Sequence, residues 1–241
     1  QFRLRDLTMA VARSLLADLE FRAYPHLGVT VQAYLRDAEE DILDLVTLAQ
    51  TRSAPLTVRL VKGAYWEDEV VTAQREGWPV PVLVHKTDTD AQFERLLRLL
   101  VQHSDCIRPV LASHNPRTVA SGLAACRATG LPDATIEFQI LLGMAQPLRR
   151  ALTQDGLRVR VYVPVGDTAL SMAYLSRRML ETTSPDSFAR MLGDENGQQK
   201  VLARPLPTPD LKHIPLVRAD VHPTDPEEPS PFRNEPRFDF S

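Results

Sequence analysis

Short apolar runs rich in β-branched residues alternate with amphipathic stretches through most of the chain. The runs have the length of strands, and the stretches after them repeat apolar residues at helical spacing. The predicted strands are Gly28–Ala33, Thr57–Val61, Pro109–Ser113, Ala134–Leu141 and Arg158–Pro164, with a weaker sixth at Pro81–Val84. The predicted helices are Ala38–Ala49, Glu67–Arg75, Asp90–Gln102, Pro116–Ala128, Gln146–Thr153 and Thr168–Leu180. Near-continuous apolar strands that alternate with helices indicate a parallel sheet covered by helices.

Five or six such strands fit either an open doubly wound sheet or part of a (β/α)8 barrel. Polar residues come directly after several strands, in Gln32-Ala33-Tyr34, Lys62-Gly63-Ala64-Tyr65-Trp66, Ser113-His114-Asn115 and Gln139. This favours the barrel, because all strand ends of a barrel open onto one rim, whereas an open sheet gathers its site at one switch point. We therefore predict the α/β class, with an incomplete (β/α)8 barrel of about five to six of the eight strands.

Both ends of the chain depart from this repeat. The first residues already form a helical pattern, with apolar residues at Leu7, Val11, Leu15, Leu16 and Leu19. Since the chain also begins without Met, we expect it to be part of a longer one. Nine of the 19 prolines fall in Arg204–Ser241, which predicts an extended linker toward a further domain.

Composition and charge narrow the classes of function. Hydrophobic residues make up 44% of the 241 residues and charged residues 24%, a mix typical of a globular protein. The net charge of -3 provides no bulk basic surface for nucleic acid. The two cysteines, Cys106 and Cys126, lack the spacing of a disulfide framework, and no metal site is indicated. No apolar run approaches the roughly 20 residues of a membrane span, and no signal peptide is recognisable, so we expect a cytoplasmic protein.

The densest candidate for chemistry is the run from Val58 to Trp66. Arg59 stands inside an apolar strand, where a guanidinium needs either an internal salt bridge or an anionic ligand or cofactor. Gly63 allows the backbone to approach a ligand closely, and Tyr65 and Trp66 offer flat faces for a ring.

Other polar residues near strand ends have two interpretations each. Ser113-His114-Asn115 is either a helix cap or a catalytic base with its neighbours, and Lys86-Thr87 is either a solvated turn or a phosphate contact. Gln32 and Gln139 are amides that suit the edge of a heteroaromatic ring. Adjacent arginines on a helix point about 100° apart, so Arg177 and Arg178 form a solvated basic turn unless an anion draws both inward.

Five motifs then occur in the order and spacing of a known domain. They are VRLVKGAYW, SHN after a strand, EFQ followed by Leu142-Gly143-Met144, RVYVPVG, and AYLSRRMLE. Over about residues 1–200 the chain closely resembles the proline dehydrogenase domain of bacterial bifunctional proline utilisation A proteins. Residues 204–241 resemble the linker that leads, in those proteins, to an aldehyde dehydrogenase-type domain.

The resemblance implies a distorted (β/α)8 barrel that binds FAD and oxidises L-proline to pyrroline-5-carboxylate by hydride transfer. It also implies a membrane quinone as electron acceptor, and with it a cytoplasmic protein that is peripheral at the inner membrane face. The parent chain would include an aldehyde dehydrogenase domain that uses NAD, which is missing here. Whether the protein forms a homo-oligomer stays an open question, and no nucleic-acid partner is expected.

The resemblance also implies a role for each matched residue. Arg59, the catalytic candidate, would lie beside the flavin ring. The cofactor-binding set would comprise Gln32, Arg59, Lys62, Gly63, Ala64, Trp66, Lys86, Ser113, His114, Asn115, Gln139 and Glu181. Arg177 and Arg178 would clamp the proline carboxylate, while Tyr174 and Tyr65 would pack on the ring.

Some features depart from the family, and two other hypotheses stay open. Val84-His85-Lys86 stands where family members usually have Thr-Arg-Lys or Thr-His-Lys. The family's substrate-binding lysine and an acidic residue lie upstream of the matched region, so we expect about three strands of the barrel to lie outside this sequence. The alternatives are a Schiff-base lyase with Lys62 as the amine, and a non-catalytic fragment.

Overall fold

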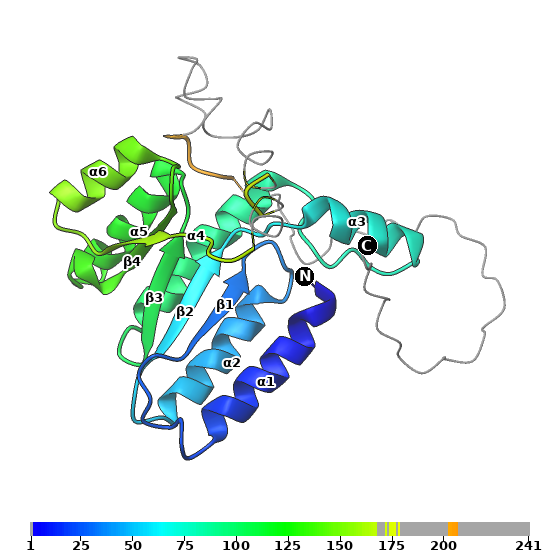
Figure 1. Ribbon diagram of the computed structural model, residues 1–241, viewed down its shortest axis with the longest axis horizontal. Coiled ribbons are helices and arrows are strands. Elements are labelled where there is room, and N and C mark those ends of the chain that lie inside the picture. The colour runs from blue at the N-terminus through cyan, green and yellow to red at the C-terminus, as the bar shows by residue number, and fades with distance from the viewer. Residues whose placement is uncertain (1, 168–171, 173, 177, 179–201, 207–241) are drawn as a thin grey trace.

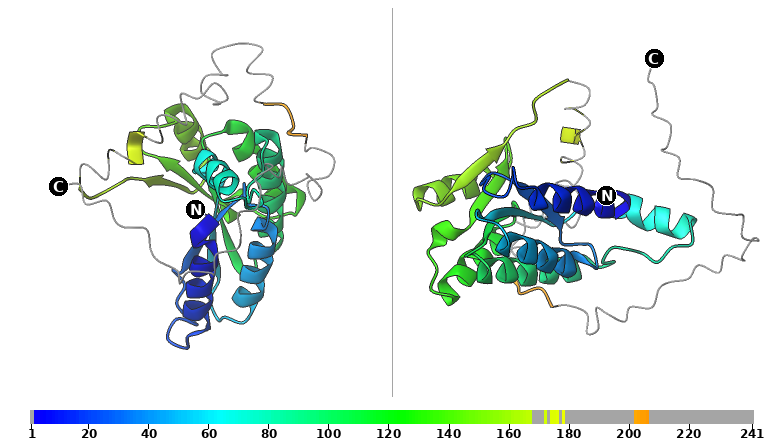
Figure 2. Two further views of the ribbon diagram at one scale, coloured as in Figure 1. Left: turned by 90° about the vertical axis from the view of Figure 1, so that its right-hand side faces the viewer. Right: turned by 90° about the horizontal axis from the view of Figure 1, so that it is seen from below.

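Five parallel strands form the centre of the protein (Figures 1 and 2). The computed structural model describes residues 2–167, 172, 174–176, 178 and 202–206. The strands are β1 (Gly28–Gln32), β2 (Leu56–Val61), β3 (Ile107–Ala112), β4 (Glu137–Leu141) and β5 (Val159–Tyr162). They lie side by side in chain order, and each neighbouring pair is parallel. Sequential order without a reversal is the topology of a (β/α)8 barrel, so the predicted incomplete barrel is confirmed, with five strands among the described residues.

Helices connect and cover the strands. They are α1 (Arg5–Ala17), α2 (Ala38–Gln50), α3 (Trp66–Arg75), α4 (Lys86–Gln102), α5 (Pro116–Ala128) and α6 (Gln146–Gln154), with 3-10 turns at Phe2–Leu4 and Asp133–Thr135. Helices α2, α4 and α5 lie together on one side of the sheet, and α1 lies beside α2 (Figures 1 and 2). No helix in the described part of the chain is long and apolar enough to cross a bilayer.

The core lies between the strands and these helices. Successive residues of a strand point to opposite faces, so every second residue meets the helices. The buried residues in this layer include Val58, Leu60, Leu111, Phe138, Ile140, Ile42, Leu45, Phe93, Leu97 and Cys126. The intervening strand residues, which include Arg59, Gln139 and Arg160, point to the other face, the interior of the barrel.

The weak sixth strand at Pro81–Val84 is wrong. This segment makes only an isolated antiparallel bridge, between Leu35 and Val82. Pro79 and Pro81 both lack the N–H that a ladder needs, so the run does not join the parallel sheet. Helix α4 also begins at Lys86, four residues before the predicted start, which places Lys86 in the first turn of the helix.

The helix expected at the start of the chain is present as α1, but most of its apolar residues are not buried. Met9 and Leu16 face the core, whereas Leu7, Val11 and Leu15 are exposed. The predicted helix Thr168–Leu180 lies mostly outside the described residues, and nearly all of the predicted linker 204–241 does too.

Candidate functional site

Arg59 lies on the inner face of the sheet, near the middle of β2. Its neighbours Val58 and Leu60 are fully buried under the helices, so strand alternation turns Arg59 the other way. Its Nε donates a hydrogen bond to Oε1 of Gln139 at 2.7 Å, and its Cζ lies 5.8 Å from the centre of the Tyr162 ring. Burial lowers the pKa of the guanidinium, and Arg178 lowers it further. The internal salt bridge considered from the sequence is not found, because no carboxylate pairs with Arg59 among the described residues.

Gln139 belongs to a chain of polar contacts on that face. Its Nε2 donates to Oε1 of Glu137 at 2.9 Å, and Arg160 binds both carboxylate oxygens of Glu137. The sequence analysis assigned no role to Glu137 or Arg160, although they begin the motifs EFQ and RVYVPVG. The available signal was Arg160, a charged residue in an apolar strand like Arg59, but its partner lies 23 residues away.

Lys62 and Lys86 meet at one carboxylate. Lys62 pairs with Asp90, and Nζ of Lys86 lies 2.6 Å from the other oxygen of Asp90. Burial would raise the pKa of Asp90, but the two lysines outweigh it and the pKa falls. Burial lowers the pKa of Lys62, although Asp90 opposes this. Asp90 was missed by the sequence analysis, although its spacing from Lys86 is that of a helical ion pair.

The loop between β2 and α3 is built against Tyr34. The peptide N–H of Tyr34 donates to the carbonyl oxygen of Lys62, and Nε1 of Trp66 donates to the carbonyl oxygen of Leu83 at 2.9 Å. Gly63 has a φ of +134°, and a Cβ there would overlap the Tyr34 ring. Gly63 is therefore required by close packing and backbone conformation together.

The predicted ring-facing residues of this loop follow Gly63 directly. Ala64 and Tyr65 are half-buried, and Trp66 begins α3 with 40% of its surface exposed.

We expect Gly63→Ala to lower the free energy of unfolding of the full-length protein by about 3 kcal/mol. The methyl group must displace the Tyr34 ring, and alanine rarely adopts this φ. Gly77→Ala is the matched control, because its φ is also positive but nothing lies within 4 Å of the new Cβ. Urea unfolding of both variants measures the difference, and equal losses would show that Tyr34 does not constrain the loop.

The residues after β3 cap a helix and link two strand ends. Oδ1 of Asn115 accepts hydrogen bonds from the backbone N–H groups of Arg117 and Thr118, so the predicted helix cap is confirmed. Oγ of Ser113 accepts from the N–H of Asn115 at 3.2 Å.

His114 links the ends of β3 and β4. Its Nε2 accepts from the N–H of Leu141 at 3.0 Å, which requires this nitrogen to be unprotonated. Burial lowers the pKa of His114, and Arg178 adds to the effect.

Arg178 and Tyr174 lie on this same inner side. The Tyr174 ring centre is 5.9 Å from that of Tyr162, and Cζ of Arg178 is 5.3 Å from the Tyr174 ring. Since Arg178 lowers the pKa of both Arg59 and His114, its charge is felt at β2 and at the end of β3. The structure thus brings Arg59, His114, Tyr174 and Arg178 together.

The other predicted site residues lie at the sheet edge or beyond the described part. Gln32 is half-buried at the end of β1, beside Val61 of β2. Arg177 and Glu181 fall outside the described residues.

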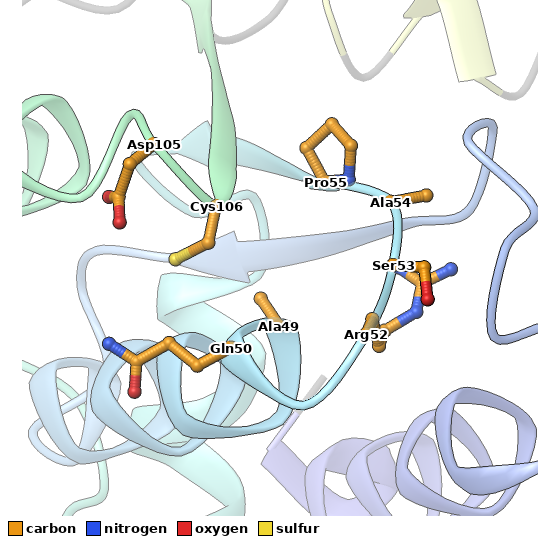
Figure 3. Close-up of a pocket in the computed structure, with 8 residues that line it drawn as sticks. All are labelled: Ala49, Gln50, Arg52, Ser53, Ala54, Pro55, Asp105 and Cys106. Atoms are coloured by element: carbon orange, nitrogen blue, oxygen red, sulfur yellow. The ribbon is translucent and has the colours of Figure 1, made fainter.

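A cavity of about 250 Å³ lies elsewhere, at the opposite end of the strands (Figure 3). Pro55 and Cys106, which immediately precede β2 and β3, contribute to its lining. None of the predicted site residues lines this cavity. Active sites of barrels occur at the carboxyl ends of the strands, so this cavity is not the candidate site.

Parallel strands in barrel order, with polar side chains on the inner face and at the strand ends, define part of a (β/α)8-barrel domain. The model of the family described as proline dehydrogenase matches residues 1–191. The chain therefore belongs to the proline dehydrogenase family.

Relatives and solved structures agree with this family. The chain is 33% identical to the bifunctional protein PutA of Salmonella typhimurium over 196 residues, covering 78% of this chain and 15% of that protein. It is 33% identical over 199 residues to mitochondrial proline dehydrogenase 1 of Homo sapiens, covering 79% of this chain and 32% of the relative.

The crystal structure of proline utilization A from Bdellovibrio bacteriovorus inactivated by N-propargylglycine is similar, with a TM-score of 0.82 and 39% identity. That match covers 98% of this chain and 24% of the other. The chain thus spans only a small part of the relatives that it matches.

Proposed function

We propose that the full-length protein oxidises L-proline to pyrroline-5-carboxylate, with FAD as the hydride acceptor. The main support is the half-buried guanidinium of Arg59, which faces the barrel interior near Arg178 and the Tyr162 ring. Among the described residues, no carboxylate pairs with it. A cation in this setting suits a ligand on which negative charge develops. Membership of the proline dehydrogenase family supports the same activity.

The donor set fits FAD. Lys62 and Lys86 hold two ammonium groups against the single carboxylate of Asp90, which leaves an excess positive charge for a pyrophosphate. The half-exposed indole of Trp66 offers a ring face, and the amides of Gln32 and Gln139 suit the edge of a flavin. The remaining cofactor residues in the proposal are Gly63, Ala64, Ser113, His114, Asn115 and Glu181. FAD, when bound, supplies an acceptor for a hydride.

Proline is held by its carboxylate and by its ring. Arg178 and Arg177 would bind the carboxylate, because a planar guanidinium makes two-point contacts with it. Tyr174 and Tyr65 would pack against the apolar ring. In the reaction, the ring carbon that is bonded to nitrogen and does not carry the carboxylate gives a hydride to the flavin. The nitrogen loses a proton, and a C=N bond forms between these two atoms.

The wider partners follow from the same proposal. A membrane quinone would take the electrons, and an aldehyde dehydrogenase domain that uses NAD would consume the product. The relative named bifunctional protein PutA supports a second activity in the longer protein.

The Schiff-base alternative has weaker support. A lysine acts as a nucleophile only as the neutral amine. Lys62 and Lys86 both donate hydrogen bonds to the carboxylate of Asp90, and an ammonium group that is held as a donor in this way has no lone pair for attack on a carbonyl group. This pairing suits the binding of a phosphate better than attack on a carbonyl group.

We expect Arg178→Lys and Arg177→Lys each to raise KM for proline roughly tenfold, since a charge-assisted hydrogen bond contributes about 1.5–3 kcal/mol. Steady-state kinetics of the full-length protein measures this. Prolinamide, which lacks the negative charge, is the matched control and should discriminate little between wild type and variant. An unchanged KM for proline in both variants would contradict the carboxylate clamp.

A further inference from the structure

We propose that Glu137 is a positioning residue for Arg59, and that it acts through the amide of Gln139 while Arg160 holds its carboxylate. The proposal rests on the proposed function, because it gives Arg59 its task at the flavin. The three contacts run across β2, β4 and β5 on the inner face of the barrel. The contact between Gln139 and Glu137 is local to β4, whereas the contacts of Arg59 and Arg160 join different strands and therefore depend on the fold.

The strand register aligns these side chains. Arg59 is paired with Val110 of β3, and Val110 is paired with Glu137 of β4, so Arg59 and Glu137 stand at one level of the sheet. Gln139 stands two residues further along β4 and is paired with Arg160 of β5. Residues that pair across parallel strands point to the same face, which brings all four polar side chains onto the inner face.

Glu137 determines which way the Gln139 amide faces. An ionised carboxylate only accepts hydrogen bonds, so the NH₂ end of the amide must face it, as Nε2 does at 2.9 Å from Oε1. The amide oxygen is then left for the Nε–H of Arg59, at 2.7 Å. The flipped amide would set NH₂ against the guanidinium N–H and oxygen against the carboxylate, so both hydrogen bonds would be lost.

Arg160 keeps Glu137 in place and ionised. Its Nε and Nη2 lie 2.7 Å and 2.8 Å from the two carboxylate oxygens, a two-point contact that fixes the plane of the carboxylate. The Glu137 side chain is 10% exposed and that of Arg160 is 68% exposed. Arg160 therefore neutralises the charge of Glu137 from the solvent side, and Glu137 offers Gln139 a hydrogen-bond acceptor in a fixed position. We call the contacts from Glu137 through Gln139 to Arg59 the relay.

The relay leaves the rest of Arg59 available for the flavin. Within the described part of the chain, Arg59 uses Nε alone in hydrogen bonding, and neither Nη group has a partner there. A guanidinium that is held by Nε keeps both Nη groups in one defined plane. Without Glu137, the amide would rotate and Arg59 would sample several orientations, so its stabilisation of developing negative charge would weaken.

Two substitutions in the full-length protein separate the roles of the acceptor and of the charge. Glu137→Met removes the acceptor, and Glu137→Gln keeps an acceptor oxygen without the charge. We expect Glu137→Met to lower kcat roughly tenfold with little change in KM and to lower the midpoint potential of the bound flavin. Glu137→Gln should have a kcat and a flavin potential between those of Glu137→Met and those of the wild type.

The matched control is Asp41→Asn. Asp41 of α2 is also a buried carboxylate bound at two points by an arginine, but its partner is Arg5 of α1, away from the inner face of the barrel. This control should leave kcat and the flavin potential unchanged. In a double-mutant cycle, Glu137→Met should have no further effect on kcat or potential once Arg59 is methionine, because the relay acts only through Arg59.

A Glu137→Met variant with the kcat and flavin potential of the wild type would overturn the relay. So would a Glu137→Met substitution that lowers kcat as much in the Arg59→Met background as in the wild type. A crystal structure of Glu137→Met tests the relay whether or not the protein is active. The Nε of Arg59 should move out of hydrogen-bond distance of Gln139 Oε1, and retention of that contact would refute the relay. A wild-type protein that does not bind FAD or oxidise proline would refute the proposed function, and this crystal structure would still decide the relay.

Discussion

Arg59→Met is expected to lower kcat/KM for proline oxidation by the full-length protein about a hundredfold or more. A preorganised donor that faces developing charge in a water-poor site is typically worth a factor of 100 to 1000. Methionine has similar length, but it supplies neither the charge nor the hydrogen bond to Gln139. Steady-state kinetics with proline under excess FAD measures the loss.

Arg108→Met is the matched control for this substitution. Arg108 is the arginine of the neighbouring strand β3, it is exposed, and its Nη1 donates to the carbonyl oxygen of Pro25 near the amino end of the strands. Activity of Arg108→Met should stay within about twofold of wild type, because this end of a barrel contributes to stability and not to catalysis. Arg59→Met with wild-type kcat/KM and an intact fold would remove Arg59 from the reaction.

Residues 1–241 expressed alone are expected to aggregate, to bind FAD weakly and to oxidise proline negligibly. Strands β1 and β5 each pair on one side only within the described sheet, so both outer edges present free backbone groups. Helix α1 and the turn after it also expose large apolar side chains, with Leu7 at 61%, Val11 at 50% and Leu19 at 80%. Light scattering during size-exclusion chromatography measures the aggregation, and an absorbance spectrum of the eluted protein measures the bound FAD.

Substitution of the exposed residues separates the two causes. Replacing Leu7 and Val11 with glutamine should reduce the aggregation, because it removes apolar surface without touching the core. It should not restore FAD binding, since the sheet edges stay open. A monomeric wild-type chain with stoichiometric flavin and proline-dependent activity would show that an open five-stranded sheet suffices for the site.

Much of the barrel could be predicted from the sequence, because each strand has a local signal. The helix Pro116–Ala128 was predicted with the bounds of α5, since Asn115 and Pro116 form a cap and a first turn that are visible in the sequence. The segment Pro81–Val84 has the same apolar pattern as a strand. The apolar pattern does not show that proline lacks the N–H group that a strand ladder needs. The burial of α1 depends on which elements pack on it, and no local pattern contains that information.

The site was only partly predictable for the same reason. Arg59 and the loop after it stand out, because polar residues in and after an apolar strand need an explanation. Asp90 and Glu137 do not stand out, since an acidic residue is ordinary until its partner is known. Lys62 is 28 residues from Asp90 and Arg160 is 23 residues from Glu137, so the fold brings each pair together. The acceptor role of His114 toward the N–H of Leu141 likewise depends on two strand ends meeting.

Anaerobic titration of the purified full-length protein with L-proline tests the central claim most directly. The protein should carry the absorbance spectrum of oxidised FAD, and proline should bleach that spectrum to completion, with pyrroline-5-carboxylate formed in equal amount to the flavin reduced. An oxidised flavin spectrum that persists in saturating proline, or a folded protein that binds no FAD, would contradict the assignment of this chain to a proline-oxidising flavin site.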